Sequence, residues 1–426
     1  MRRLLVALVL SLAGTTLRAA AQSPCCDPWT DLGQALAGAS GAPTFEATGS
    51  LADGTQLVFE LDGAAASAPS WLLAGFTSLA APFKGGVMVP EPQAVVPLVT
   101  DASGHLSLVG SWPLGVPQAT TLFAQFWVQD AGAPKGYAAS NAQLGTTPPP
   151  PPTGSLPADW INGSNCGGDP PIQIQQYGDN TWILRQNKCT NFEGPFMFLF
   201  FGQDRGIMFD TGAGNIPIYT TVNGIVQAWA TAHGKVNYPL TVAHTHSHGD
   251  HIAGDSQFAG KPDVTLVGTS QTAVAAFFGF QDWPNDIVQY ELGGRTLDIL
   301  AIPGHQAAHI AIFDHETCLF LTGDTLYPGH LFISGAVSQG NFAKYKASCQ
   351  RMVDFVADKP IAIIWGNHVE AKNTPFQFYP YPTSSQPNEH DPYLDRAHLI
   401  ELNDAVQAMT TPHVEAHADF SIEPNG

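Results

Sequence analysis

The chain has 426 residues, of which 44% are hydrophobic and 12% are charged, so it is long enough and apolar enough for more than one core. Its 17 basic residues stand against 36 acidic ones, a net charge of −19, which excludes nucleic acid and anionic membrane surfaces as favourable partners. Aromatic residues make up 10% and argue against disorder over most of the length. We therefore expect a folded, acidic protein of two domains.

The first 21 residues have the layout of a secretory signal peptide. Arg2 and Arg3 precede an apolar run from Leu4 to Gly14, and small residues lead to a cleavage site after Ala21. The alternative, a membrane anchor, needs roughly 20 apolar residues, and this run is shorter. We predict that residues 1–21 are removed, which leaves 14 basic and 36 acidic residues, a net charge of −22. The protein is then secreted or periplasmic and inserts into no membrane.

Five consecutive prolines, Pro148 to Pro152, divide the chain and predict a stiff, extended linker over 148–154. Before it, residues 22–147 hold short apolar runs such as TQLVFEL and TLFAQFWVQD between Gly, Pro, Ser and Asp clusters. That pattern predicts a small all-β sandwich. The stretch FAQFWVQDAGAPKGYAASNA resembles a small β-module of exported bacterial proteins. Its role is either that of a stabilising spacer, which we favour, or that of a module that binds a surface polymer.

Residues 155–426 alternate strands with helices, as α/β domains do. A helix is expected near 216–233, and a second over 342–356, where apolar residues recur at spacings of three and four. Apolar runs predict strands over 197–201, 206–209, 240–243, 264–267, 289–292, 296–302, 309–313, 318–321 and 361–364. The architecture implied is layered, with mixed sheets.

Six cysteines allow several disulfide pairings in an oxidising compartment, and none has the spacing of a zinc knuckle. They are Cys25, Cys26, Cys166, Cys189, Cys318 and Cys349. We predict the pairs Cys166–Cys189 and Cys318–Cys349, because each pair lies within one segment of the chain.

The stretch AHTHSHGDH, residues 243–251, gathers four histidines and an aspartate. Alternate residues of an extended turn project similarly, so His246 and His248 can reach one metal ion while Asp250 and His251 face another. Zinc accepts imidazole nitrogen and carboxylate oxygen at ~2.0–2.2 Å. These four ligands cannot complete two sites, so further ligands must come from elsewhere in the chain.

The HxHxDH pattern of 246–251 resembles the metal motif of the metallo-β-lactamase fold hydrolases. Three further motifs follow in the family's order, each after an apolar strand: PGH at 303–305, TGDTLY at 322–327 and GNH at 366–368. The resemblance implies an αββα metallo-β-lactamase sandwich over 155–426, in the branch of glyoxalase II and the lactonases.

The resemblance also implies seven metal ligands and two Zn²⁺ ions per chain, with iron or manganese as alternative metals. By position, the first ion would be bound by His246, His248 and His305, and the second by Asp250, His251 and His368. Asp324 would bridge the two ions. Asp210, in FDTG, matches an early aspartate that braces the ligand loop, although it could instead cap a helix. His244 lies outside the ligand pattern and is expected to pack or to hold a ligand's free ring nitrogen.

Such a pair of ions holds a hydroxide that attacks the carbonyl of an ester, lactone or related acyl substrate, while one ion polarises the oxygen. Asp250 would accept a proton as the intermediate collapses. Tyr327 is either a packed aromatic or a phenol that donates to the substrate's carbonyl oxygen, as a similarly placed tyrosine does in family lactonases. The leading expectation is a secreted dinuclear zinc hydrolase acting on a small-molecule acyl substrate.

Alternatives stay open. A mononuclear iron oxygenase of the persulfide dioxygenase type shares the fold and would use His248, His305 and Asp324. Hydrolysis of β-lactams is less favoured, because β-lactamases of this fold generally carry Ser or Cys where this chain has Asp324. Glutathione thioesters are also less favoured, since only two basic residues against nine acidic ones follow residue 368. A further alternative is a binding or scaffold protein with a vestigial metal site.

The segment YPYPTSSQPNEH, residues 379–390, resembles a tail that follows the last ligand in some members of this fold. We predict that it lies over the mouth of the metal site and shapes the substrate pocket. The alternative is surface packing.

Overall fold

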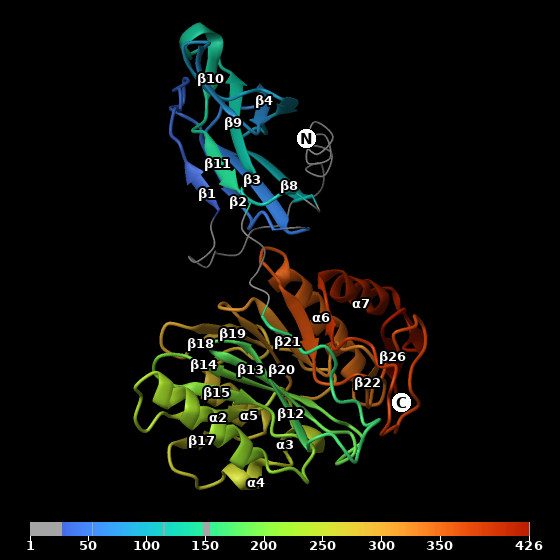
Figure 1. Cartoon of the computed structure of the whole chain (residues 1–426). Helices are drawn as coiled ribbons and strands as arrows, with labels where there is room; N and C mark the ends of the chain where they lie inside the picture. Colours follow the sequence, from blue (N-terminus) through green and yellow to red (C-terminus); the bar gives the residue numbers. More distant parts are fainter. Residues whose placement is uncertain (1–27, 53, 114–115, 148–153, 426) are drawn as a thin grey trace. The chain divides into compact units, whose positions relative to one another are not determined.

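The computed structural model describes residues 28–52, 54–113, 116–147 and 154–425; the predicted signal peptide, Cys25, Cys26 and the proline run lie outside them. Contacts divide the chain into two compact units, Met1–Pro150 with Phe355–Pro360, and Pro151–Asp354 with Ile361–Gly426 (Figure 1). The boundary falls within the five prolines. Within the described ranges, none of the helices combines the length and the apolar character needed to cross a bilayer.

The first unit is rich in β-structure, as predicted. Its two main sheets follow the orders β1-β11-β9-β4-β7, with β10 beside β9, and β2-β3-β8, and β5 pairs with β6. The elements are β1 (Trp29–Asp31), β2 (Thr44–Thr48), β3 (Gln56–Asp62), β4 (Pro69–Gly75), β5 (Ser78–Phe83), β6 (Gly86–Pro90), β7 (Ala94–Val99), β8 (Leu106–Ser111), β9 (Thr121–Gln129), η1 (Pro134–Gly136), β10 (Tyr137–Ala139) and β11 (Gln143–Thr146).

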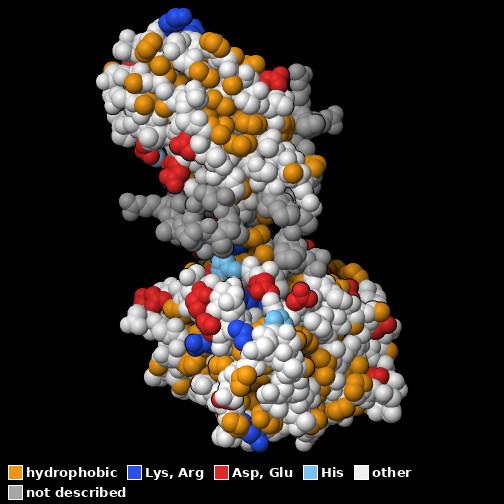
Figure 2. All heavy atoms as spheres, turned by 60° about the vertical axis from the view of Figure 1, so that its left-hand side comes forward, with side chains coloured by type: hydrophobic (Ala, Val, Ile, Leu, Met, Phe, Trp, Pro, Cys, Tyr) orange, Lys and Arg blue, Asp and Glu red, His pale blue; other side chains and the backbone are white. Residues whose placement is uncertain are grey.

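Side chains from both main sheets share one core in this unit. Phe45 of β2 contacts Phe59 of β3 and Phe126 of β9 edge to face, with ring centroids 5.1 and 4.9 Å apart. This inward alternation produces a sandwich. On the face shown in Figure 2, hydrophobic side chains are frequent on this unit, and Lys and Arg are sparse.

The second unit contains two six-stranded sheets. The first sheet has the order β12 (Ile172–Gly178), β13 (Thr181–Gln186), β14 (Phe196–Phe201), β15 (Gly206–Phe209), β16 (Leu240–Ala243) and β17 (Val264–Leu266). The second has the order β18 (Ile287–Glu291), β19 (Thr296–Ala301), β20 (Ile310–Asp314), β21 (Leu319–Gly323), β23 (Ile363–Gly366) and β24 (Tyr393–Leu394). A smaller sheet has the order β22 (His330–Ile333), β26 (Ser421–Pro424) and β25 (Glu415–Ala416).

The two large sheets enclose a common core, and helices cover their outer faces (Figure 1). Alternation along β14 explains the layers: Phe198 packs into the core shared with the second sheet, and Leu199 packs against the helix side. The helices are α2 (Ile218–Ala232), α3 (Gly249–Ile252), α4 (Asp255–Phe258), α5 (Gln271–Phe278), α6 (Asn341–Val356) and α7 (Arg396–Ala408). The α/β class predicted for this part of the chain is confirmed.

Strands buried on both faces and helices with one continuous apolar face were predicted best. The run over 206–209 coincides with β15, the helix expected near 216–233 is α2, and that over 342–356 is α6. By contrast, β12 was not predicted, although Ile172 and Ile174 alternate with glutamines. A half-exposed strand at a sheet edge carries few apolar residues, so its signal is weak.

The predicted pairing of cysteines is half right. A disulfide joins Cys166 to Cys189, with the Cα atoms 5.5 Å apart. The predicted bond between Cys318 and Cys349 is wrong, and both thiols are buried. Cys318 lies in the turn before β21, whereas Cys349 lies on the fully buried face of α6, where burial raises the pKa of its thiol. Nearness in sequence did not bring these two side chains together.

A buried ion pair ties the segment after the last predicted ligand to the first sheet. The two terminal guanidinium nitrogens of Arg185, on β13, donate to the carboxylate oxygens of Glu389 at 2.5 and 2.6 Å. The two side chains are 0% and 6% exposed. Removal of one partner would leave the other charge buried without compensation.

We therefore expect Glu389→Gln to lower the free energy of unfolding by roughly 3 to 5 kcal/mol, measured by chemical denaturation. Glu316→Gln is the matched control, because Glu316 also faces a buried arginine, Arg295, at 3.7 Å, but is 40% exposed. The control should cost less than about 1 kcal/mol. Equal losses in the two variants would contradict the importance of the buried pair.

Candidate metal centre

The seven predicted ligands come from loops at the ends of strands. The loop after β16 carries His246 and His248, and the short helix α3 carries Asp250 and His251. His305 follows β19, Asp324 follows β21 and His368 follows β23. All seven are brought together, in two groups of side chains whose ligand atoms lie within 4.8 Å of one another.

The first group contains the side chains of three histidines. His248 Nδ1 lies 3.1 Å from His246 Nε2 and 2.9 Å from His305 Nε2. One oxygen of Asp324, Oδ2, lies 3.5 Å from His246 Nε2 and 3.6 Å from His305 Nε2. Three nitrogens and one oxygen thus surround one point.

The second group shares the same oxygen. Asp324 Oδ2 lies 3.4 Å from Nε2 of both His251 and His368. Asp250 Oδ2 lies 3.0 Å from His251 Nε2 and 3.1 Å from His368 Nε2. Asp324 Oδ2 therefore lies between two sets of ligand atoms.

These separations fit a tetrahedral cation. Ligand atoms bound to zinc at ~2.0–2.1 Å lie about 3.3–3.4 Å from one another, close to the distances in both groups. The second oxygen of Asp324, Oδ1, is buried and has no hydrogen-bond partner among the described residues, as expected for a carboxylate that faces cations. The residues present therefore fit a pair of divalent metal ions.

The ring nitrogens that face away from the centre have partners. His305 Nδ1 lies 2.7 Å from the carbonyl oxygen of Phe332, and His368 Nδ1 lies 3.2 Å from that of Glu193. A carbonyl accepts only from a protonated nitrogen, so these contacts place a proton on Nδ1 and leave Nε2 as the nitrogen that would bind a metal ion. Neither Phe332 nor Glu193 was predicted to take part.

Asp210 lies behind the ligands and holds three segments together. It is fully buried; its Oδ1 accepts from the backbone nitrogen of Thr245 at 2.8 Å, and its Oδ2 accepts from the Thr245 hydroxyl at 2.8 Å. Oδ2 also accepts from Asn367 Nδ2 at 2.7 Å and lies 3.2 Å from His251 Nδ1. The bracing role expected for Asp210 agrees with these contacts, and α2 begins too far along the chain for Asp210 to cap it.

Two motif glycines allow close packing beside the ligands. Gly304 has a φ of 149°, and a Cβ atom there would lie 2.5 Å from the Cα atom of Tyr345. At Gly366, a Cβ atom would lie 2.4 Å from the carbonyl oxygen of Leu326. The glycines of PGH and GNH therefore let the backbones that carry His305 and His368 approach α6 and the segment after β21.

The electrostatics differ between the two groups. Burial lowers the pKa of His305 to about 4 and that of His246 well below its usual value, so both are neutral and able to donate a lone pair. Burial also opposes a charge on His251 and His368, but Asp250 and Asp324 raise the pKa of both well above the usual value. The two carboxylates of the second group thus favour positive charge in this part of the centre, as a site for cations requires.

The other predicted residues lie close by. The Tyr327 hydroxyl donates to the carbonyl of His330, and the Tyr327 ring centroid lies 5.6 Å from that of His368. His244 Nε2 lies 2.8 Å from Asp255 Oδ1, so His244 contacts a carboxylate and not a ligand imidazole. Glu193 and Glu370 form a third group with His368, which the sequence did not indicate because neither glutamate belongs to a motif.

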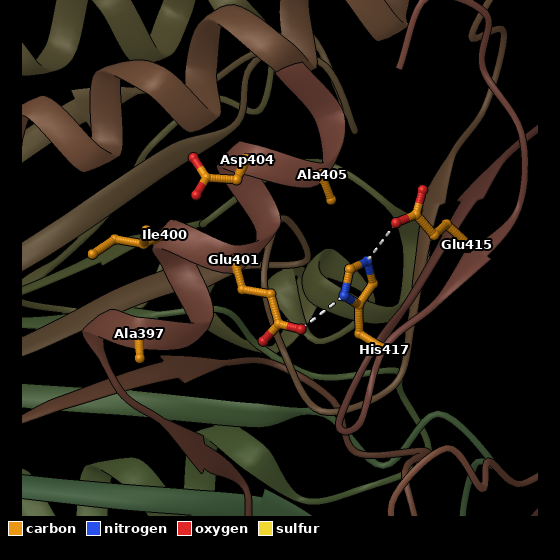
Figure 3. Close-up of a pocket in the computed structure, with 7 residues that line it drawn as sticks. All are labelled: Ala397, Ile400, Glu401, Asp404, Ala405, Glu415 and His417. Carbon is orange, nitrogen blue, oxygen red and sulfur yellow. Dashed lines mark hydrogen bonds and ion pairs between the residues drawn. The ribbon is translucent and has the colours of Figure 1, made fainter. Parts of the chain in front are cut away.

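A separate surface hollow of about 570 Å³ lies beside α7 (Figure 3). His417 reaches into it, with Nδ1 2.8 Å from Glu401 and Nε2 3.4 Å from Glu415. None of the seven ligands lines this hollow. It is therefore no part of the metal centre.

The sequence of this chain is similar to that of known proteins over the residues that carry the centre. Residues 191–368 match the sequence model of the Metallo-beta-lactamase superfamily. The acyl-coenzyme A thioesterase MBLAC2 of Bos taurus is 24% identical over 209 residues, which are 42% of this chain and 74% of that protein. The hydroxyacylglutathione hydrolase of Ectopseudomonas mendocina is 34% identical over 105 residues, which are 24% of this chain and only 39% of that enzyme.

Among solved structures, a metallo-beta-lactamase from Pontibacter korlensis aligns with 56% of this chain and 100% of its own, at 15% identity and a TM-score of 0.38. The sequence model covers the loop after β16, His305, Asp324 and His368 within one span. The chain thus contains a metallo-β-lactamase superfamily domain over residues 191–368, and this domain carries all seven predicted ligands.

Proposed function

We propose that the second unit is a dinuclear zinc hydrolase that cleaves small acyl substrates at an ester, lactone or thioester bond. The observation that carries this proposal is the position of Asp324 Oδ2, which lies within 3.4 to 3.6 Å of the ring nitrogens of four histidines in two groups. A carboxylate that lies between two sets of donors can bind two adjacent cations at once. Metal ions bound there would activate water and polarise the substrate carbonyl.

The residues of the chain have distinct tasks in this proposal. His246, His248 and His305 hold one side of the centre, and His251 and His368 hold the other. Asp250 is 20% exposed against 8% for Asp324, so Asp250 is the carboxylate of the two more open to the substrate. We assign Asp250 the acceptance of the proton that is released when the tetrahedral intermediate collapses.

Tyr327 takes part only if its hydroxyl leaves the carbonyl of His330 when substrate binds. It is 3% exposed, and burial raises the pKa of its phenol well above the usual value, so the group stays protonated and able to donate. The packed-aromatic alternative accounts for its present contacts.

The names of the relatives and the ligand set support the proposed class of bond. The acyl-coenzyme A thioesterase and the hydroxyacylglutathione hydrolase, by their names, both act on acyl thioesters. Esters, lactones and thioesters share one chemical step, the attack of water on an acyl carbon, so one centre can serve all three. We therefore propose an acyl hydrolase and place β-lactams after these substrates.

Export of the protein is part of the proposal. The sequence of residues 1–21 supports it, and so does the disulfide between Cys166 and Cys189, because such bonds persist in oxidising compartments.

Metal removal tests the proposed function. Dialysis of the purified protein against a chelator should abolish hydrolysis of a panel of model esters, lactones and thioesters, and Zn²⁺ should restore it, with about two zinc ions per chain by elemental analysis. Full hydrolysis by the metal-free protein would contradict the proposal. About one iron per chain would instead favour the oxygenase alternative.

A further inference from the structure

We propose that Tyr381, together with Phe192 and Phe332, forms an aromatic rim beside the metal centre that selects acyl substrates carrying a flat apolar group. These three residues are called the aromatic rim below. This inference rests on the proposed acyl hydrolase function and adds the class of acyl group to it.

The rim is built around Tyr381, which lies on the segment 379–390 after the last ligand. The ring of Tyr381 lies 5.3 Å from that of Phe192 and 5.3 Å from that of Phe332, at interplanar angles of 81° and 67°. Tyr381 is nevertheless 51% exposed, so one part of its surface is open. Edge-to-face packing holds the ring in place without covering it.

The rim is connected to both halves of the metal centre. The carbonyl of Phe332 is the partner of His305 Nδ1 at 2.7 Å, so Phe332 adjoins the first group. Glu193 follows Phe192 in the chain, and its carbonyl is the partner of His368 Nδ1 at 3.2 Å. The Tyr381 hydroxyl donates to Glu193 Oε1 at 2.7 Å. Tyr381 thus contacts residues whose carbonyls hold one ligand of each group, His305 and His368.

The charges beside the rim disfavour an anionic carrier. Glu193 places a carboxylate there, and the nearby cation, Lys188, is 2% exposed. The Lys188 ammonium donates inward, to the carbonyls of Phe192 at 3.2 Å and Glu193 at 3.3 Å. Lys188 therefore does not offer its charge to a substrate bound to coenzyme A or glutathione, whereas an uncharged aromatic group finds three rings.

The test measures binding and turnover separately. Calorimetry of the metal-loaded full chain compares phenylacetate with acetate, the two carboxylate products, and kinetics compares the phenylacetyl and acetyl esters of one alcohol. We expect the wild-type protein to bind phenylacetate roughly tenfold more tightly and to show a KM roughly tenfold lower for the phenylacetyl ester.

Three variants locate the preference. Tyr381→Ala should bring both ratios to within about threefold without change in metal content, and Phe192→Leu should lower them in part. Tyr381→Phe, which keeps the ring, should retain the preference. Phe376→Ala is the matched control, because Phe376 is an exposed aromatic (63%) near the same segment and is outside the rim.

Equal binding of the two carboxylates by the wild-type protein, or an unchanged ratio in Tyr381→Ala, would overturn the rim proposal. A preserved binding preference without hydrolysis of any ester would retain the rim and refute the hydrolase function. Loss of the preference in Phe376→Ala to the same extent as in Tyr381→Ala would also overturn the proposal, because the effect would then not be specific to the rim.

Discussion

Asp324→Asn should lower kcat/KM for the acyl substrate that the wild-type protein hydrolyses by roughly a thousandfold, and should reduce the metal that remains bound after desalting. The reason is geometric. Asp324 Oδ2 is the atom shared by the two groups of ligands, 3.4 Å from His251 and His368 and 3.5 Å from His246. An asparagine keeps the shape but removes the negative charge, and its amide nitrogen cannot bind a cation.

The measurement combines elemental analysis with steady-state kinetics on the same preparation. Asp354→Asn is the control, because Asp354 is an exposed aspartate on α6 that accepts a hydrogen bond from Gln350 at 2.8 Å. This variant should retain wild-type metal content and turnover. If Asp324→Asn also retained both, the two groups of ligands would not depend on a shared carboxylate, and the dinuclear proposal would be wrong.

The parts of the fold that the sequence predicted share a physical origin. Strands such as β14, with the sequence FMFLFF, are buried on both faces, so nearly every residue is apolar and the run stands out. The helix α6 presents Phe342, Tyr345 and Cys349 on one buried face, and the spacing of three and four identifies it. Where an element is half exposed, as β12 is, polar residues interrupt the pattern.

The sequence predicted the ligand side chains of the candidate site but not the backbone groups that hold them. His246, Asp324 and His368 belong to motifs with recognisable residues, so a resemblance can assign them. The carbonyls of Phe332 and Glu193, which hold His305 and His368, are backbone groups that every residue possesses. No sequence pattern specifies which backbone carbonyl faces a ligand, because that depends on how the loops pack.

The cysteines show the same limit. Cys166 and Cys189 lie in loops that meet, whereas Cys318 lies in a turn between strands and Cys349 lies on a helix packed in the interior. The two pairs have similar separations along the chain, 23 residues for Cys166 and Cys189 and 31 for Cys318 and Cys349. What distinguishes them is whether the fold brings the Cα atoms within the ~4.4–6.8 Å that a disulfide allows.

Asp210→Asn should lower both stability and metal affinity although Asp210 contacts no metal-facing atom. Its carboxylate accepts hydrogen bonds from Thr245 and Asn367. The amide nitrogen of an asparagine cannot accept a hydrogen bond, so one of these donors would lose its acceptor. We expect a loss of roughly 2 to 3 kcal/mol in the free energy of unfolding and a 10- to 100-fold loss of zinc affinity. Denaturation of the metal-free protein and zinc titration measure the two effects separately.

The choice of asparagine isolates the hydrogen bonds from the backbone. Asp210 has a φ of 67°, a left-handed conformation that asparagine tolerates and alanine does not, so Asp210→Ala would add strain to the loss of contacts. Thr245→Val removes a single hydroxyl donor to Asp210 and should cost less, about 1 to 2 kcal/mol. If Asp210→Asn lowered stability but left zinc affinity unchanged, Asp210 would be a packing residue. A fall in both would establish that the brace sets the positions of His246, His251 and His368 at once, because Thr245, His251 and Asn367 all meet at its carboxylate.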